Sequence, residues 1–215
     1  MKAFLSFAVL LVTFGVGTGN VVGQQSAASS GESETETIVF LRHGEKPPRG
    51  LGQLTCQGLN RSLALPQVLL SKFGKPDYIF APDPAQKVTE GGLSQYDYVR
   101  PLATIEPTAI RLGMPVNTNF GFKEIHALQV ELAKRQYEKA LIFVAWEHTE
   151  LEKMLKNLVK EFAGDPAQVP YWPETDYDSI YVMRISNDKI PKTATLTHDH
   201  EGLDNLSRNC PEVKP

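Results

Sequence analysis

Several features that mark common classes of protein are missing from this sequence. Its 215 residues carry a formal net charge of −3, so no basic excess indicates a nucleic-acid-binding protein. The chain has no internal repeat, and its long apolar run near the N-terminus is shorter than a membrane span. Only two cysteines occur, and neither follows that run where a lipoprotein anchor would lie. The length suits one domain with a sizeable core.

The N-terminal segment has the parts of a secretory signal peptide. A lysine is followed by an apolar run over residues 3–16 and by small residues before Gln24. We therefore expect residues 1–23 to be removed during export to the periplasm or the exterior, with no stable membrane insertion afterwards; an uncleaved anchor is the alternative. Residues 24–36 are small, polar and aperiodic, which predicts a disordered linker before a domain over residues 37–215.

Export bears on the two cysteines, Cys56 and Cys210, which both lie in the mature part of the chain. An exported protein meets an oxidising compartment, where the two can form a disulfide. Two free, buried thiols are the alternative, and the sequence leaves both open.

Strand-like and helix-like segments alternate along the predicted domain. The alternation predicts a βαβ architecture, a three-layer α/β/α sandwich with a mostly parallel central sheet. The predicted strands are residues 36–41, 78–82 and 140–146, with a closing antiparallel pair over 179–186 and 193–198; the predicted helices are 54–73, 101–112 and 149–162. Pro66 should kink or split the first of these helices, and Pro107 should kink the second. Residues 83–95 are expected to form a long loop.

Two histidines directly follow apolar strands. His43 comes at the end of "TIVFL" with Arg42, and His148 at the end of "LIFVAW". In open α/β sheets, ligands bind beyond the carboxyl ends of the strands, where helix N-termini also gather. Thr149 and Glu152 have the spacing of a capping box, which would place a helix N-terminus directly after His148.

Cations accompany these histidines. Arg42 precedes His43, and Arg100 stands just before a proline where a helix should begin. A guanidinium has a planar donor fork that suits phosphate oxygens, and Gly44 permits a turn and a close approach to a ligand. An imidazole among such cations can attack phosphorus and form a covalent phosphohistidine. The pattern therefore predicts an anion site with nucleophilic chemistry.

Five segments around these residues resemble the histidine phosphatase superfamily, whose members have the phosphoglycerate-mutase-like fold. "LRHGE", "LTCQG", "RPLATIEPTAIRLGMPV", "FKEI" and "FVAWEH" occur in the order of the family's motifs. The resemblance implies that His43 is the nucleophile. It also implies that Arg42, Arg100 and His148 bind the phosphoryl group and stabilise its transition state. It implies no metal and no other cofactor.

The resemblance is loosest at the proton donor. Glu124, within "FKEI", falls at the position of the family's acidic residue, and Glu45 and Glu147 are rivals for the role. The segment Asp83–Tyr98 is an insertion before Arg100 relative to the family pattern. Further along, His198 and His200 would share one face of an extended strand and offer a metal site; a solvated polar turn is the alternative.

These features predict an exported, metal-independent hydrolase, a phosphomonoesterase of the histidine acid phosphatase type. Its reaction would be hydrolysis of a small-molecule phosphomonoester through a phosphohistidine. A phosphoglycerate-mutase-type phosphotransferase and a non-catalytic phosphate-binding module on the same fold are the alternatives. Lys46 and Arg49 are candidates for the substrate mouth. Neither the substrate nor an oligomeric state follows from the sequence.

Overall fold

The computed structural model describes residues 35–187 and 190–212. The predicted signal peptide and most of the predicted linker lie outside these ranges. The first strand, β1, begins at Thr35, so residues 35 and 36 of the predicted linker belong to the sheet. No helix within the described ranges is long and apolar enough to cross a membrane.

A five-stranded sheet with the order β2-β5-β1-β6-β7 forms the central layer. Its strands are β1 Thr35–Arg42, β2 Tyr78–Phe80, β5 Leu141–Trp146, β6 Ser179–Ser186 and β7 Thr193–His200. The strands β2, β5 and β1 pair in parallel, while β6 is antiparallel to both β1 and β7. Four strands therefore run in one direction and only β6 runs against them, which confirms the mostly parallel sheet and its antiparallel closing pair.

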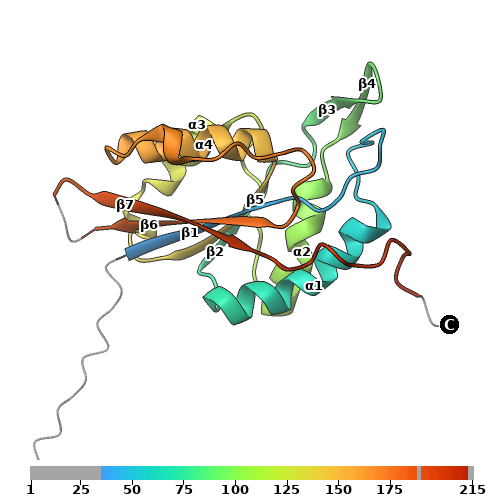
Figure 1. The fold of residues 1–215 in the computed structure, drawn as a ribbon, viewed down its shortest axis with the longest axis horizontal. Helices are drawn as coiled ribbons and strands as arrows, with labels where there is room; N and C mark the ends of the chain where they lie inside the picture. The colour runs from blue at the N-terminus through green and yellow to red at the C-terminus, as the bar shows by residue number, and fades with distance from the viewer. Residues whose placement is uncertain (1–34, 188–189, 213–215) are drawn as a thin grey trace, which may run out of the picture. The chain divides into compact units, whose positions relative to one another are not determined.

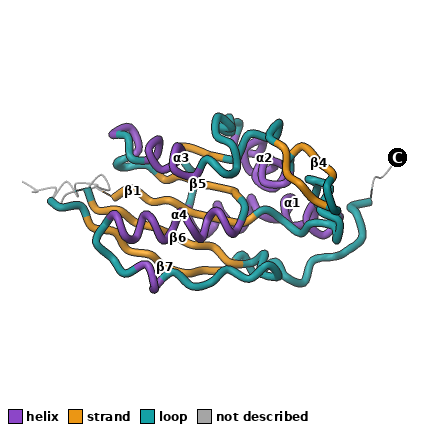
Figure 2. Tube along the Cα trace, turned by 90° about the horizontal axis from the view of Figure 1, so that it is seen from above, coloured by secondary structure: helices purple, strands orange, loops and turns teal. Residues whose placement is uncertain are grey.

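Helices cover both faces of this sheet. Figure 1 shows α1 and α2 on one side and α3 and α4 on the other. Their bounds are α1 Cys56–Phe73, α2 Arg100–Leu112, α3 Ile125–Leu132 and α4 His148–Glu161. Figure 2, seen from above, shows α4 running along β1 and β6.

Alternation along β1 explains why two helical layers are needed. Val39 and Leu41 pack with α1 and α2 in one buried cluster. Ile38 and Phe40 pack with α3 and α4 in the other. Since successive side chains point to opposite faces of a strand, an apolar run such as this one must be covered on both sides. The three-layer sandwich is thereby confirmed.

Both prolines lie inside helices that remain unbroken. Pro66 is within α1 and Pro107 within α2, so the split that was one predicted outcome at Pro66 does not occur. A proline inside a helix costs about 3 kcal/mol or more. Buried side chains on both sides of each proline, such as Leu65 and Leu69 in α1, keep the helix packed on the sheet and offset that cost.

The predicted loop over residues 83–95 is largely a β-hairpin instead. It consists of β3 Lys87–Glu90 and β4 Ser94–Asp97, joined across Gly91 and Gly92, both of which have positive φ. The hairpin projects beyond the helical layer (Figure 1), and its side chains are exposed or only partly buried. Because neither strand of the hairpin buries an apolar face, the sequence has no alternation of apolar and polar residues that would predict these strands. The adjacent glycines, Gly91 and Gly92, were the available signal of a tight turn.

A disulfide between Cys56 and Cys210 joins the first residue of α1 to the C-terminal segment, across 154 positions of sequence. Asn60 adds to this connection, because its side-chain amide donates to the carbonyl oxygens of Ser207 and Asn209, each at 2.8 Å. The structure thus decides in favour of the bridge that the sequence left open.

Candidate active site

The ends of β1 and β5 lie side by side and bring the two histidine segments together. Arg42 pairs in register with Trp146, and the backbone N–H of His43 donates to the carbonyl oxygen of Trp146 at 3.0 Å. The helix α2 begins at the same edge, because Thr104 Oγ1 accepts from the N–H of Gly44 at 2.9 Å. The predicted residues Arg42, His43, Arg100 and His148 therefore belong to one edge of the sheet.

Gly44 is needed for close packing rather than for a turn. Its φ is not positive, but a Cβ there would lie 3.0 Å from both Cα and O of Gly58. A Cβ on Gly58 would in turn lie 2.6 Å from the carbonyl oxygen of Glu45. Two glycines thus let the first turn of α1 pack directly against the chain that follows His43.

The imidazole of His43 is buried and held in one tautomer. Its Nδ1 lies 2.8 Å from the carbonyl oxygen of Gly44. A carbonyl can only accept, so Nδ1–H donates and the lone pair is on Nε2. Burial, followed by the charges of Arg100 and Arg42, holds the pKa of His43 well below its usual value. The imidazole is therefore neutral near pH 7, as a nucleophile must be.

Arg42 is completely buried and anchored through a single nitrogen. Its Nη1 donates to the carbonyl oxygens of Pro173, Glu174 and Asp176 at 3.3, 2.7 and 2.8 Å. Its Nε and Nη2 are also buried, and neither has a hydrogen-bond partner. One edge of the guanidinium is therefore fixed by the backbone, while the other keeps free donors.

Arg100 is anchored by a carboxylate. Its Nη1 and Nη2 donate to Oε2 and Oε1 of Glu90, both at 2.8 Å, and Nη1 also lies 3.3 Å from the carbonyl oxygen of Gly50. Its buried Nε has no partner. Each arginine thus keeps at least one desolvated donor that no protein acceptor satisfies.

Two tyrosines that sequence reasoning missed lie on either side of these groups. The ring centroids of Tyr98 and Tyr177 lie 6.1 and 6.2 Å from that of His43. The Tyr177 ring is 3.9 Å from Cζ of Arg42, and the Tyr98 ring is 4.8 Å from Cζ of Arg100. Tyr98 falls in the insertion and Tyr177 in a stretch without a motif. The one available signal was the position of Tyr98, two residues before Arg100.

The Tyr98 hydroxyl adds another unsatisfied donor. It is buried without a hydrogen-bond partner, and burial raises the pKa of Tyr98, so the hydroxyl keeps its proton. Together with Arg42 Nε, Arg42 Nη2 and Arg100 Nε, it makes a group of donors around His43. Buried polar groups are normally paired, and a set made of donors is matched by a ligand rich in acceptor oxygens.

His148 is the first residue of α4, and Glu147 caps the helix. The Glu147 carboxylate accepts from the N–H of Glu150 at 2.8 Å and lies 2.6 Å from His148 Nδ1. Burial raises the pKa of Glu147, but the hydrogen bond and charge of His148 outweigh this effect and lower it to about 2. The predicted capping box of Thr149 and Glu152 is wrong, because the N-cap is Glu147, two residues before Thr149.

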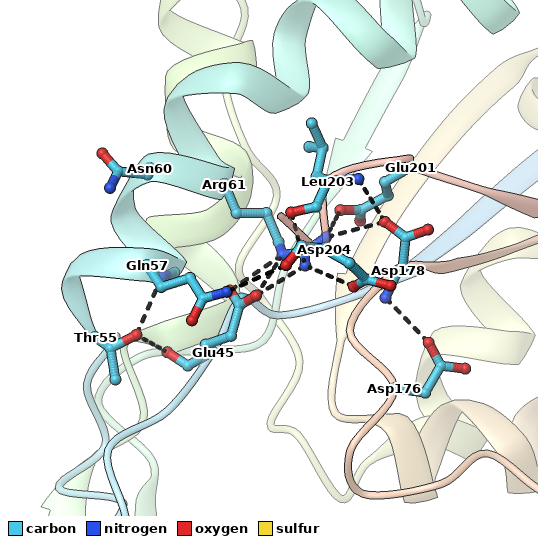
Figure 3. A network of polar contacts seen from close by, with 12 residues as sticks. Glu45, Thr55, Gln57, Asn60, Arg61, Asp176, Asp178, Glu201, Leu203 and Asp204 are labelled. Carbon is cyan, nitrogen blue, oxygen red and sulfur yellow. Dashed lines mark hydrogen bonds and ion pairs between the residues drawn. The ribbon is translucent and has the colours of Figure 1, made fainter. Parts of the chain in front are cut away.

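The three candidate proton donors occupy different surroundings. Glu124 is exposed at the N-terminus of α3, where its carboxylate accepts from the N–H of Gly121 at 2.8 Å. Within the described ranges, no hydrogen bond or ion pair joins it to the other predicted site residues. Glu45 binds the buried Arg61 at 2.8 Å (Figure 3). Glu147 contacts His148. The role of Glu124 stays a prediction.

A cavity of about 300 Å³ lies beside the arginines. Its walls include Lys46, Arg49, Glu90, Glu174 and Tyr177. Lys46 and Arg49, which the sequence suggested for a substrate mouth, thus line a cavity that reaches the partners of Arg42 and Arg100, although neither of those two arginines nor His43 lines it.

His198 and His200 belong to β7. This segment is therefore extended, as the prediction that the two side chains share one face required. The rings of His198 and His200 lie 4.6 Å apart between centroids, on one face of the strand. His198 Nε2 is 2.8 Å from Ser179 Oγ. In the part of the chain that the structure describes, no group of three or more His, Cys, Asp or Glu side chains is arranged to hold a metal ion.

Comparison with known proteins gives no match to a family model and none to a curated protein. Solved structures do match. A mycobacterial glucosyl-3-phosphoglycerate phosphatase in complex with inorganic phosphate is 14% identical with a TM-score of 0.50, covering 75% of this chain and 95% of its own. A phosphoglycerate mutase from Plasmodium falciparum is 13% identical with a TM-score of 0.48, covering 84% and 99%.

A phosphoserine phosphatase mutant from Entamoeba histolytica in complex with phosphoserine also matches. It is 12% identical with a TM-score of 0.47, and the match covers 80% of this chain and 99% of the other. Two of these three structures are phosphatases by description and one is a phosphoglycerate mutase. Identities this low establish the fold and not the activity. The fold assignment rests on the mycobacterial structure, whose TM-score is 0.50. The chain has the phosphoglycerate-mutase-like fold.

Proposed function

We propose that this protein is a phosphatase that hydrolyses a phosphomonoester through a phosphohistidine at His43. The observation that carries the proposal is the group of buried donors without partners, on Arg42, Arg100 and Tyr98, around a neutral imidazole. A phosphoryl group supplies the acceptor oxygens that these donors lack, and its phosphorus is the electrophile that a neutral imidazole needs. The predicted phosphate-binding role of His148 is part of the proposal.

The reaction has two displacements. In the first, the lone pair on His43 Nε2 forms a bond to phosphorus while the bond from phosphorus to the substrate oxygen breaks. That oxygen takes up the proton of the carboxylic acid predicted at Glu124. In the second, a water oxygen bonds to phosphorus, the P–N bond breaks, and the proton lost by the water is taken up by the Glu124 carboxylate that the first step left. Arg42 and Arg100 stabilise the charge on the phosphoryl oxygens in both steps.

Export is a part of the same proposal. The disulfide between Cys56 and Cys210 supports it, because such bonds persist in oxidising compartments. The substrate would then be a phosphomonoester of the periplasm or the exterior.

The experiment traps the intermediate. The full chain is mixed with a ³²P-labelled aryl phosphate and quenched, and we expect acid-labile, base-stable label on His43. His43→Ala should lose both label and turnover while keeping its circular dichroism spectrum. His126→Ala, an exposed histidine of α3, is the matched control. Undiminished turnover in His43→Ala would rule out the proposed nucleophile.

A further inference from the structure

The hairpin β3–β4 ends at the proposed phosphate site. Glu90 is the last residue of β3, and Tyr98 directly follows β4. The Glu90 side chain is 12% exposed and that of Arg100 is 3% exposed. Besides its two bonds from Arg100, the Glu90 carboxylate accepts from the N–H of Gly52 at 2.8 Å. A segment inserted before Arg100 thus reaches back to that arginine.

The contact leaves one edge of Arg100 free. A guanidinium can bind a carboxylate or a phosphate bidentately through its Nη1/Nη2 edge or through its Nε/Nη2 edge. Glu90 takes the first edge. The Nε atom is buried without a partner, and Nη2 has a second hydrogen beyond the one that it donates to Glu90. The second edge therefore remains available to a phosphoryl group.

Each of the two arginines is held in place by protein acceptors that bind its Nη atoms. Backbone carbonyls from residues 173, 174 and 176 hold Nη1 of Arg42, and the Glu90 carboxylate performs the same task for Arg100. Burial raises the pKa of Glu90, but its bonds from Arg100 and Gly52 outweigh burial and lower it, so the carboxylate is ionised. A long arginine side chain that is already fixed loses less conformational freedom when the ligand binds.

We propose that Glu90 is a positioning residue, which holds Arg100 so that its Nε/Nη2 edge faces the phosphoryl group at His43. The hairpin then contributes to phosphate binding through Glu90 and is more than a surface insertion. The inference rests on the proposed function for its catalytic meaning, although its effect on anion binding can be measured without turnover.

The test measures binding of inorganic phosphate to the full chain by calorimetry, together with kcat and KM for an aryl phosphate. Glu90→Gln keeps the size of the side chain but removes the charge and one of the two acceptors. We expect phosphate to bind about 10-fold more weakly and kcat/KM to fall about 10–100-fold, since misplacing a catalytic contact by 1 Å can cost about 10². Glu90→Asp should recover part of the loss.

Two comparisons separate positioning from general damage. Asp97→Asn is the matched control, because Asp97 is a carboxylate of the same hairpin that pairs with Lys87 and not with Arg100. It should leave phosphate affinity unchanged. In addition, Glu90→Gln should have no further effect on phosphate affinity in an Arg100→Ala background, since Glu90 acts through Arg100.

Other results overturn the inference. Tighter phosphate binding in Glu90→Gln would mean that the carboxylate competes with the ligand for Arg100. Unchanged affinity, or an undiminished effect in the Arg100→Ala background, would mean that Glu90 does not act through that arginine. If Glu90→Gln fails to fold, the same comparison is made with Glu90→Asp. A chain that binds phosphate but does not hydrolyse an ester contradicts the proposed function alone, and one that binds no phosphate contradicts both.

Discussion

Nη1 of Arg61, which is completely buried, lies 2.5 Å from the buried carboxylate of Glu201. The same guanidinium binds Glu45 at 2.8 Å and lies 3.4 Å from Asp178 and 3.3 Å from Asp204. Figure 3 shows Arg61 extending from its helix between these carboxylates. It thereby joins α1 to the segment after His43 and to the C-terminal part of the chain.

Arg61→Met should therefore be strongly destabilising. Removing one partner of a buried ion pair leaves charge without compensation and costs about 3–5 kcal/mol. Urea denaturation, followed by circular dichroism, measures the change in the free energy of unfolding. Lys153→Met is the control, because Lys153 forms an exposed pair with Glu150 and should cost at most about 1 kcal/mol. Equal losses of unfolding free energy in the two variants would show that the ion pairs of Arg61 stabilise the fold no more than an exposed pair does.

The disulfide should make a large contribution to stability. A loop closed across 154 positions corresponds to roughly 5 kcal/mol in the chain-entropy model, less any strain in the native state. The double variant Cys56→Ser/Cys210→Ser should unfold at a much lower urea concentration than the oxidised protein, and reduction of the wild type should have the same effect. Mass analysis of the native protein under non-reducing conditions would contradict the bridge if it found two free thiols.

The proton donor can be assigned with two leaving groups. An alkyl alcohol needs a proton to leave, whereas a phenolate leaves without help. We expect Glu124→Gln to cut turnover of an alkyl phosphate by about 10²–10⁴-fold and to change that of an aryl phosphate little. The reason is the family resemblance, which places the acidic proton donor at Glu124, whereas the hydrogen bond and charge of His148 lower the pKa of Glu147 to about 2 and leave it without a proton to donate. Glu147→Gln is measured in parallel, and if it alone shows the selective loss, the role belongs to Glu147.

A buried carboxyl far from the site predicts a pH dependence of stability. Burial raises the pKa of Glu36 from 4.5 to about 8, although the charge of Lys192 partly opposes it. The folded protein therefore binds more protons than the unfolded chain in this range, and the contribution of Glu36 to stability falls as pH rises from about 4.5 to about 8.

Glu36→Gln should flatten this decline and make the protein more stable than the wild type at pH 9, while changing little at pH 4. Thermal unfolding across this pH range provides the measurement. The control is Glu161→Gln, an exposed carboxyl that lines the same cavity as Glu36. Parallel stability curves for the wild type and Glu36→Gln would contradict the assignment.

Export gives a prediction that depends on the sequence alone. Expression of residues 1–215 in a host with a secretion pathway should yield a mature N-terminus near Gln24, because the small residues before it suit a signal peptidase. N-terminal sequencing of the exported fraction checks this. Full-length protein that stays in the cytoplasm would reject it.

Local pattern alone determined the strands that carry the site. The unbroken apolar runs before Arg42 and Trp146 specify strands buried on both faces, and such strands place the residues that follow them at one edge of a parallel sheet. For the same reason His43, His148 and Arg100 could be placed at one edge of the sheet without the structure, since each lies at a strand end or a helix start.

Tertiary structure decided everything that depends on residues far apart in sequence. The bond between Glu90 and Arg100, the tyrosine beside Arg42, the cluster around Arg61 and the disulfide all join segments that no local period connects. Hydrophobic alternation specifies which face of an element is buried, but it does not specify which polar side chain will meet which. Which polar side chains meet depends on how the layers pack, because a buried charge is stable only where the folded chain supplies a partner for it.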